Sequence, residues 1–192
     1  MIDLPGLQQE LLEEVYKVNK NIVLVLFNGR PLAINWAAEH VPSIVEAWQL
    51  GSQSGNAIAQ VLYGDYNPSG KLPMTFPRSV GQIPIYYNHM NTGRPVSPGP
   101  ELVFWSHYID QTNDPLYPFG YGLSYSNFEY ANISVENDYG ASGVVKVSVD
   151  LTNSGTMDGK EVVQLYIHDM HASVARPVRE LKGFELVELS AG

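Results

Sequence analysis

Apolar and polar residues follow three successive patterns along the chain, and the first pattern predicts helices and strands in alternation. Residues 5–19 carry leucine and valine at the spacing of one helix face, with Asp3 as the expected N-cap. Residues 22–27 are apolar without alternation, which is typical of a strand covered on both faces. A second strand is predicted at residues 43–48 and a second helix at residues 56–63. This order predicts part of an α/β domain with a mostly parallel sheet.

The second pattern has no regular period. Residues 65–125 are rich in proline, glycine, asparagine and aromatic residues. A loop of this length within a compact domain is unusual and is often either functional or poorly ordered. Its tyrosine-rich segment, residues 85–94, sets stacking faces beside hydrogen-bond donors, as carbohydrate clefts do. The alternative is that these rings only pack the loop onto the domain, and composition alone slightly favours this second interpretation.

The third pattern alternates apolar and polar residues, as in an antiparallel β-sandwich. Turn-forming residues at 137–140 and 153–155 separate the alternating segments. The predicted strands are residues 128–135, 144–151, 162–167 and 181–189. A complete sandwich of this kind has about seven strands, so only part of one is predicted here. We therefore expect two units, residues 1–125 and residues 126–192.

Composition and charge narrow the classes of function. The chain has 192 residues, of which 44% are hydrophobic, and a formal net charge of −9, which indicates a globular, acidic protein. Nonspecific binding of nucleic acid needs clustered lysine and arginine, so neither nucleic acid nor an anionic membrane surface is an expected partner. The longest apolar run, residues 22–27, is too short to span a bilayer. The absence of cysteine excludes disulfides and thiolate chemistry.

The residues alone offer weak candidates for catalysis. Glu10, Glu13 and Glu14 belong to the first predicted helix and are expected on its solvated face. Hydrolysis of a glycoside needs two carboxyl groups roughly 5–9 Å apart across a pocket, which neighbours on a helix surface do not provide. The five histidines lack the spacing of a metal site, and we predict neither a metal nor another cofactor.

Four motifs resemble glycoside hydrolase family 3, in the order in which that family carries them. The first, at residues 51–77, reads GSQSGNAIAQVLYGDYNPSGKLPMTFP. The second, within residues 84–95, contains YNH and TGRP. The third is LYPFGYGLSY at residues 116–125, and the fourth is RPVRELKGF at residues 176–184. The resemblance extends over essentially the whole chain and is greatest toward periplasmic bacterial β-glucosidases.

The resemblance implies a retaining β-glycosidase, of β-glucosidase or β-xylosidase type, that hydrolyses O-glycosyl bonds and releases terminal non-reducing sugars. Such enzymes have an N-terminal (β/α)₈-type barrel, an α/β sandwich and a fibronectin-III-like domain. Residues 1–125 then correspond to the C-terminal half of the α/β sandwich with its long aromatic loop, and residues 126–192 to the N-terminal part of a truncated fibronectin-III-like domain. The implied substrates are β-linked oligosaccharides or aryl glucosides, and the implied location of the full-length enzyme is periplasmic or secreted.

The catalytic residues of the family have no matching position in this sequence. Its aspartate nucleophile belongs to the barrel, which we expect to be missing here. Its acid/base glutamate commonly lies upstream of the region that matches residue 5. We therefore assign no catalytic residue and expect a fragment that is inactive alone. The alternative from another class is a stand-alone carbohydrate-binding or accessory protein without catalysis.

Residues 87–94 resemble the family's long loop near the interdomain cleft, which provides candidates for substrate binding. These candidates are Asn88, His89 and Arg94. Arg94 has an equally good alternative role, which is to fix the loop by hydrogen bonds to backbone carbonyls. His107 departs from the family pattern, because relatives often carry arginine or lysine before the Tyr-x-Asp sequence, and this departure implies a weaker anchor of the loop.

Overall fold

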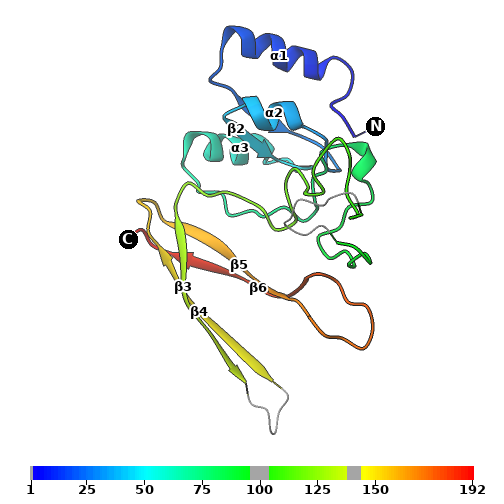
Figure 1. Ribbon diagram of the computed structural model, residues 1–192. Coiled ribbons are helices and arrows are strands. Elements are labelled where there is room, and N and C mark those ends of the chain that lie inside the picture. Colours follow the sequence, from blue (N-terminus) through cyan, green and yellow to red (C-terminus); the bar gives the residue numbers. More distant parts are fainter. Residues whose placement is uncertain (1, 96–103, 138–143) are drawn as a thin grey trace.

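The computed structural model describes residues 2–95, 104–137 and 144–192. Its first part contains the helices α1 (Gln8–Val18), α2 (Asn35–His40) and α3 (Ser54–Tyr63) and the strands β1 (Val23–Leu26) and β2 (Ser43–Glu46). Figure 1 shows these elements at one end of the molecule, a long irregular region in the middle, and long strands at the other end. None of the helices in the described ranges is both long and apolar enough to cross a membrane.

The first sheet is a short parallel ladder. β1 and β2 pair with Val23 opposite Ser43 and with Leu26 opposite Glu46. Within the described residues no further strand joins this ladder, so the predicted mostly parallel sheet is not supported. The physical reason is that an apolar segment is stabilised by burial, whether helices or strands cover it. Such a segment therefore does not specify how many strands lie beside it. Val23 is in fact 48% exposed in this chain.

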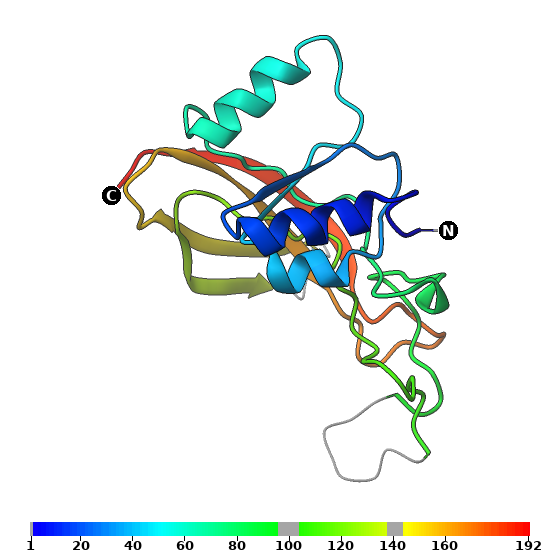
Figure 2. The same cartoon turned by 90° about the horizontal axis from the view of Figure 1, so that it is seen from above.

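One helix prediction needs correction, and one helix was not predicted. α1 begins at Gln8 rather than near residue 5, and its N-cap is Leu7, without a side-chain hydrogen bond, so Asp3 does not cap it. α2 was not predicted, because its six residues are too short to show a helical period. The rings of Trp36 and His40 in α2 are stacked, with their centroids 4.4 Å apart. Figure 2 shows α2 lying beside α1.

The core of the first part includes a residue of the irregular region. The buried cluster consists of Leu12, Leu26, Leu32, Ile34, Ala37, Val41 and Phe76. Phe76 is 2% exposed, and its ring makes edge contacts with Trp48 and Tyr117 at centroid distances of 5.9 and 6.3 Å. The backbone N–H of Phe76 also donates to Tyr117 O at 2.8 Å. Part of the predicted long loop is therefore an ordered element of the core.

The last part of the chain forms two antiparallel ladders, as the alternating pattern predicts. β3 (Phe128–Asn137) pairs with β4 (Val145–Asn153), and β5 (Gly159–Ile167) pairs with β6 (Glu180–Leu189). In the described ranges no strand of one ladder pairs with a strand of the other. The predicted turn at 153–155 lies at the end of β4, whereas most of the one at 137–140 lies outside the described residues.

Among the described residues, apolar side chains are exposed at several places, including one surface at α1 and another at β6. Leu11 of α1 and Phe27, which follows β1, are 65% and 61% exposed and line a cavity of about 670 Å³ between α1 and β1. On the second surface, Phe184 and Leu186 of β6 are 75% and 55% exposed. Soluble monomers rarely expose large apolar patches, so both surfaces are candidates for contact with further polypeptide.

Candidate functional site

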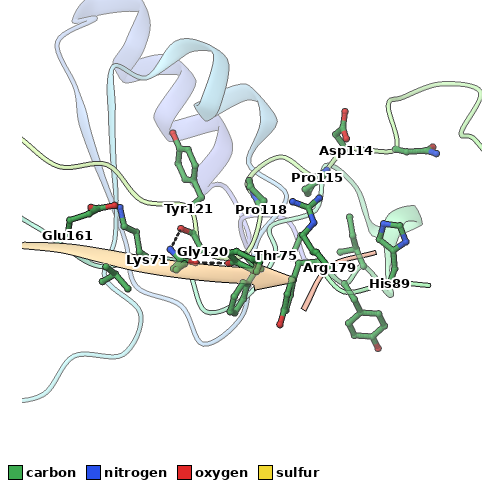
Figure 3. A pocket seen from close by; sticks show the side chains of 18 of the residues that line it. Lys71, Thr75, His89, Asp114, Pro115, Pro118, Gly120, Tyr121, Glu161 and Arg179 are labelled. Atoms are coloured by element: carbon green, nitrogen blue, oxygen red, sulfur yellow. Dashed lines mark hydrogen bonds and ion pairs between the residues drawn. The ribbon is translucent and has the colours of Figure 1, made fainter. Parts of the chain in front are cut away.

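A cavity of about 720 Å³ lies between the irregular region and β5 (Figure 3). Its walls come from segments that are distant in sequence, namely residues 71–89, residues 113–121, strands β3 and β5, and Arg179. The aromatic side chains that line it are Tyr86, Tyr87, Phe119, Tyr121, Tyr130 and Tyr166. Aromatic faces beside polar groups suit the apolar C–H face and the hydroxyls of a sugar, so this cavity is the candidate site.

Gly120 lets one wall of the cavity approach β5. Its φ of +79° lies in the left-handed region, which favours glycine. Its carbonyl accepts a hydrogen bond from Gln164 Nε2 at 3.0 Å. A Cβ atom at this position would clash with the side chains of Gln164 and Tyr166. Glycine is therefore needed at this position both for the left-handed backbone conformation and for the close approach to Gln164 and Tyr166.

A nearly buried ion pair holds one end of the cavity. Lys71 Nζ lies 3.0 Å from Glu161 Oε2, and the two side chains are 14% and 11% exposed. The same ammonium group donates to Gly122 O at 2.9 Å, and the Tyr130 hydroxyl donates to Glu161 Oε1 at 3.0 Å. Both carboxylate oxygens of Glu161 thus have partners. This glutamate has a structural role in the junction.

Tyr130 is expected to make this junction sensitive to alkaline pH. Burial, then the negative charge of Glu161 and the hydrogen bond to it, raise the pKa of Tyr130 from 10.0 to about 12. The neutral phenol is therefore favoured in the folded state, and its contribution to stability is present below pH 10.0 and is lost as the pH rises toward about 12. We expect the free energy of unfolding, measured with urea, to fall across this window and to fall less in Tyr130→Phe. An equal fall in both proteins would contradict this assignment.

Asn67 ties the two parts of the chain together. Its side chain is buried, and its Nδ2 donates to Asp158 O at 3.1 Å, next to the start of β5. Its Oδ1 accepts hydrogen bonds from the Ser124 hydroxyl and from the Tyr125 N–H, both at 2.8 Å. One amide side chain thus connects three segments of the chain.

Two of the predicted substrate residues lie at or beside the cavity. His89 lines it, and its Nδ1–H donates to Met90 O at 3.0 Å. Asn88 precedes His89 and is exposed, but it is not among the lining residues. The structure therefore brings His89 to the candidate site and leaves Asn88 at its margin.

The third predicted residue, Arg94, lies outside the cavity. Its guanidinium carbon lies 5.6 Å from the centre of the Phe104 ring, and its backbone oxygen accepts from the Ser106 N–H at 2.9 Å. His107, the position that departs from the family pattern, uses its ring Nδ1 to donate to Trp105 O at 2.8 Å. Both side chains thus contact their own loop.

Two carboxyl groups line the cavity without converging. Figure 3 shows Glu161 and Asp114 at opposite ends of the site. Asp114 accepts a hydrogen bond from the Thr112 hydroxyl at 3.1 Å. Retaining glycosidases place their two carboxyl groups about 5–5.5 Å apart around the reacting bond, and this arrangement does not provide such a pair. Among the residues that the structure describes, no group of three or more histidine and acidic side chains could hold a metal ion.

Sequence reasoning missed the residues that build the cavity wall on β5. Lys71 and Gly120 belong to the quoted motifs, whereas Gln164 and Tyr166 belong only to the strand predicted at residues 162–167, and Glu161 lies just before that strand. A signal was present, because Gln164 interrupts a run of apolar residues in β5. A polar side chain in such a position needs a hydrogen-bond partner when it is buried.

Comparison with known families identifies the chain. The model of the glycosyl hydrolase family 3 C-terminal domain matches residues 1–125. The chain belongs to glycosyl hydrolase family 3. A second model, the fibronectin type III-like domain, matches residues 161–192, which include nearly all of β5 and the whole of β6. The family 3 resemblance drawn from the four motifs is therefore confirmed.

Several family 3 relatives match the chain over its whole length. A periplasmic β-glucosidase of Salmonella typhimurium is 49% identical over 192 residues, which are 100% of this chain and 25% of that protein. A β-xylosidase of Formosa agariphila is 45% identical over 196 residues, covering 100% of this chain and 26% of that protein. The crystal structure of a β-glucosidase from Listeria innocua in complex with glucose has a TM-score of 0.94 at 46% identity, covering 100% of this chain and 27% of that chain. The chain thus spans about a quarter of the length of these relatives.

Proposed function

We propose that this chain is the C-terminal part of a retaining β-glycosidase, of β-glucosidase or β-xylosidase type, that releases terminal non-reducing sugars. The observation that carries the proposal is the alignment of the entire chain with a β-glucosidase and a β-xylosidase. The Listeria innocua enzyme has also been crystallised, as a mutant, with laminaribiose. This complex supports β-linked oligosaccharides as substrates, and we propose aryl glucosides as a second substrate class.

We further propose that the chain does not hydrolyse glycosides alone and works with an N-terminal barrel. Glu161 and Asp114 do not form a catalytic pair, and the exposed surface at Leu11 and Phe27 suits contact with further polypeptide. In this proposal residues 1–125 are the C-terminal half of an α/β sandwich and residues 126–192 begin a fibronectin-III-like domain. No cofactor or metal takes part.

Within this proposal, the loop that contains Asn88, His89 and Arg94 shapes the sugar site. His89 contributes directly from the wall of the cavity. Asn88 contributes as an exposed residue beside His89, and Arg94 contributes from the same loop outside the cavity.

The proposal is tested with nitrophenyl β-glucoside and nitrophenyl β-xyloside. The purified chain is expected to release no nitrophenol above the buffer rate. Mixing it with the part of the Salmonella β-glucosidase that precedes the segment matching this chain is expected to produce turnover that neither polypeptide gives separately. Turnover by the chain alone that survives a further purification step would contradict the claim of inactivity, and absence of turnover in the mixture would contradict the role as a glycosidase part.

A second candidate function is carbohydrate binding without catalysis, and the aromatic cavity is the observation that favours it. Tyr86 lines the cavity and is 61% exposed, whereas Tyr63 lies in α3, outside the cavity, and is 85% exposed. Under this alternative, calorimetry would detect tight binding of cello-oligosaccharides without turnover in the mixture. Tyr86→Ala would weaken this binding, and the matched control Tyr63→Ala would not.

A further inference from the structure

The backbone of His89 is held by the connection between β5 and β6. The Val178 N–H donates to His89 O at 2.9 Å, and Met90 forms an isolated antiparallel bridge with Pro177. Figures 1 and 2 both show the long connection between β5 and β6 extending toward the irregular region. The candidate substrate loop is therefore fixed, on the C-terminal side of Asn88, by the segment that matches the fibronectin type III-like domain.

The other side of Asn88 is held by β5. The Tyr87 ring stacks on Phe119 at a centroid distance of 4.3 Å, and it meets the ring of Tyr166 edge-on at 5.9 Å. The Tyr166 hydroxyl donates to Gln164 Oε1 at 2.6 Å, and Gln164 Nε2 holds the carbonyl of the residue after Phe119 at 3.0 Å. One strand thus supports both Tyr87 and its stacking partner.

We propose that Tyr166 and Val178 are positioning residues for the sugar site. Tyr166 acts through the ring of Tyr87, and Val178 acts through the backbone of His89. Together they fix the chain on both sides of Asn88 and keep His89 at the cavity. The inference rests on the proposed function, because it takes Asn88 and His89 as residues that shape sugar binding. It makes the β5–β6 hairpin a part of the binding site.

Hydrogen exchange followed by mass spectrometry tests the positioning itself. Tyr166→Leu removes the edge contact, and Val178→Pro removes the N–H that binds His89 O. In both variants, exchange across residues 85–90 is expected to be about tenfold faster, with residues 23–46 unchanged. Tyr166→Phe keeps the ring and serves as the conservative control. Val174→Pro is the control for proline in the same exposed connection.

A spectroscopic readout links the loop to sugar binding. In the wild-type chain, titration with cellobiose is expected to shift the NMR resonance of the His89 ring. Tyr166→Leu and Val178→Pro should abolish this shift, whereas Tyr166→Phe and Val174→Pro should retain it. If the wild-type chain shows no shift of the His89 resonance but hydrogen exchange in the loop responds as expected, the proposed sugar site is wrong. The positioning of the loop by Tyr166 and Val178 is then still supported. Unchanged exchange in both variants, or a uniform loss of protection along the chain, overturns the positioning role.

Discussion

Glu161→Ala is expected to lower the free energy of unfolding by about 3 kcal/mol, because it leaves the charge of Lys71 nearly buried without its partner. The two side chains are 14% and 11% exposed, so water can solvate the remaining ammonium group only in part. The substitution also removes the acceptor of the Tyr130 hydroxyl. Urea denaturation with linear extrapolation measures the loss.

Two controls separate the ion pair from a general effect of removing a carboxylate. Glu188 forms a more exposed ion pair with Lys160, with side chains 75% and 36% exposed, and Glu188→Ala should cost less than about 1 kcal/mol. The double variant Lys71→Met with Glu161→Leu removes both charges, so it should be more stable than Glu161→Ala. If Glu161→Ala and Glu188→Ala had equal effects, the buried ion pair would not stabilise the junction.

Phe76→Ala is expected to cost about 3–5 kcal/mol, because it removes a fully buried ring from the core. Phe76 packs against Trp48 and Tyr117, and its backbone pairs with Tyr117. Since domains are stable by only about 5–15 kcal/mol, this loss is a large fraction of the total and should lower the melting temperature by roughly 10 °C. Thermal melting followed by near-ultraviolet circular dichroism measures this loss.

The matched control for Phe76 is Met74, two residues earlier in the same segment and 50% exposed. Met74→Ala should change the free energy of unfolding by less than about 1 kcal/mol, as is usual for exposed positions. Similar losses in the two variants would mean that the irregular region does not form part of the core.

The local patterns of the sequence were sufficient to predict most strands and two helices. They were not sufficient to predict how many strands the first sheet contains. Alternation predicts β3, β4, β5 and β6, because one face of each strand is more apolar than the other. The run at residues 22–27 predicts β1, yet its apolar side chains favour burial against any surface. Helix or strand neighbours satisfy this preference equally, so the number of strands was not predictable.

The candidate site was predictable only in part, because its partners are distant along the chain. The resemblance to family 3 pointed to the loop that contains His89, and the structure places His89 at the cavity. The pairing of Lys71 with Glu161 depends on the tertiary fold, since several glutamates have the same chemistry. Nor does any local rule connect Asn67 with Asp158, which are 91 residues apart.

The three hydrogen bonds of Asn67 have a consequence for chimeric enzymes. A graft that exchanges the C-terminal module between relatives by cutting after Tyr125 keeps Ser124 and Tyr125 with Asn67, but it separates Asn67 from its partner Asp158. The recipient must then supply an amide at position 67 and a cation at position 71 that match the incoming β5. Crossovers that carry these two residues along with the module should fold more often than crossovers placed at the apparent boundary.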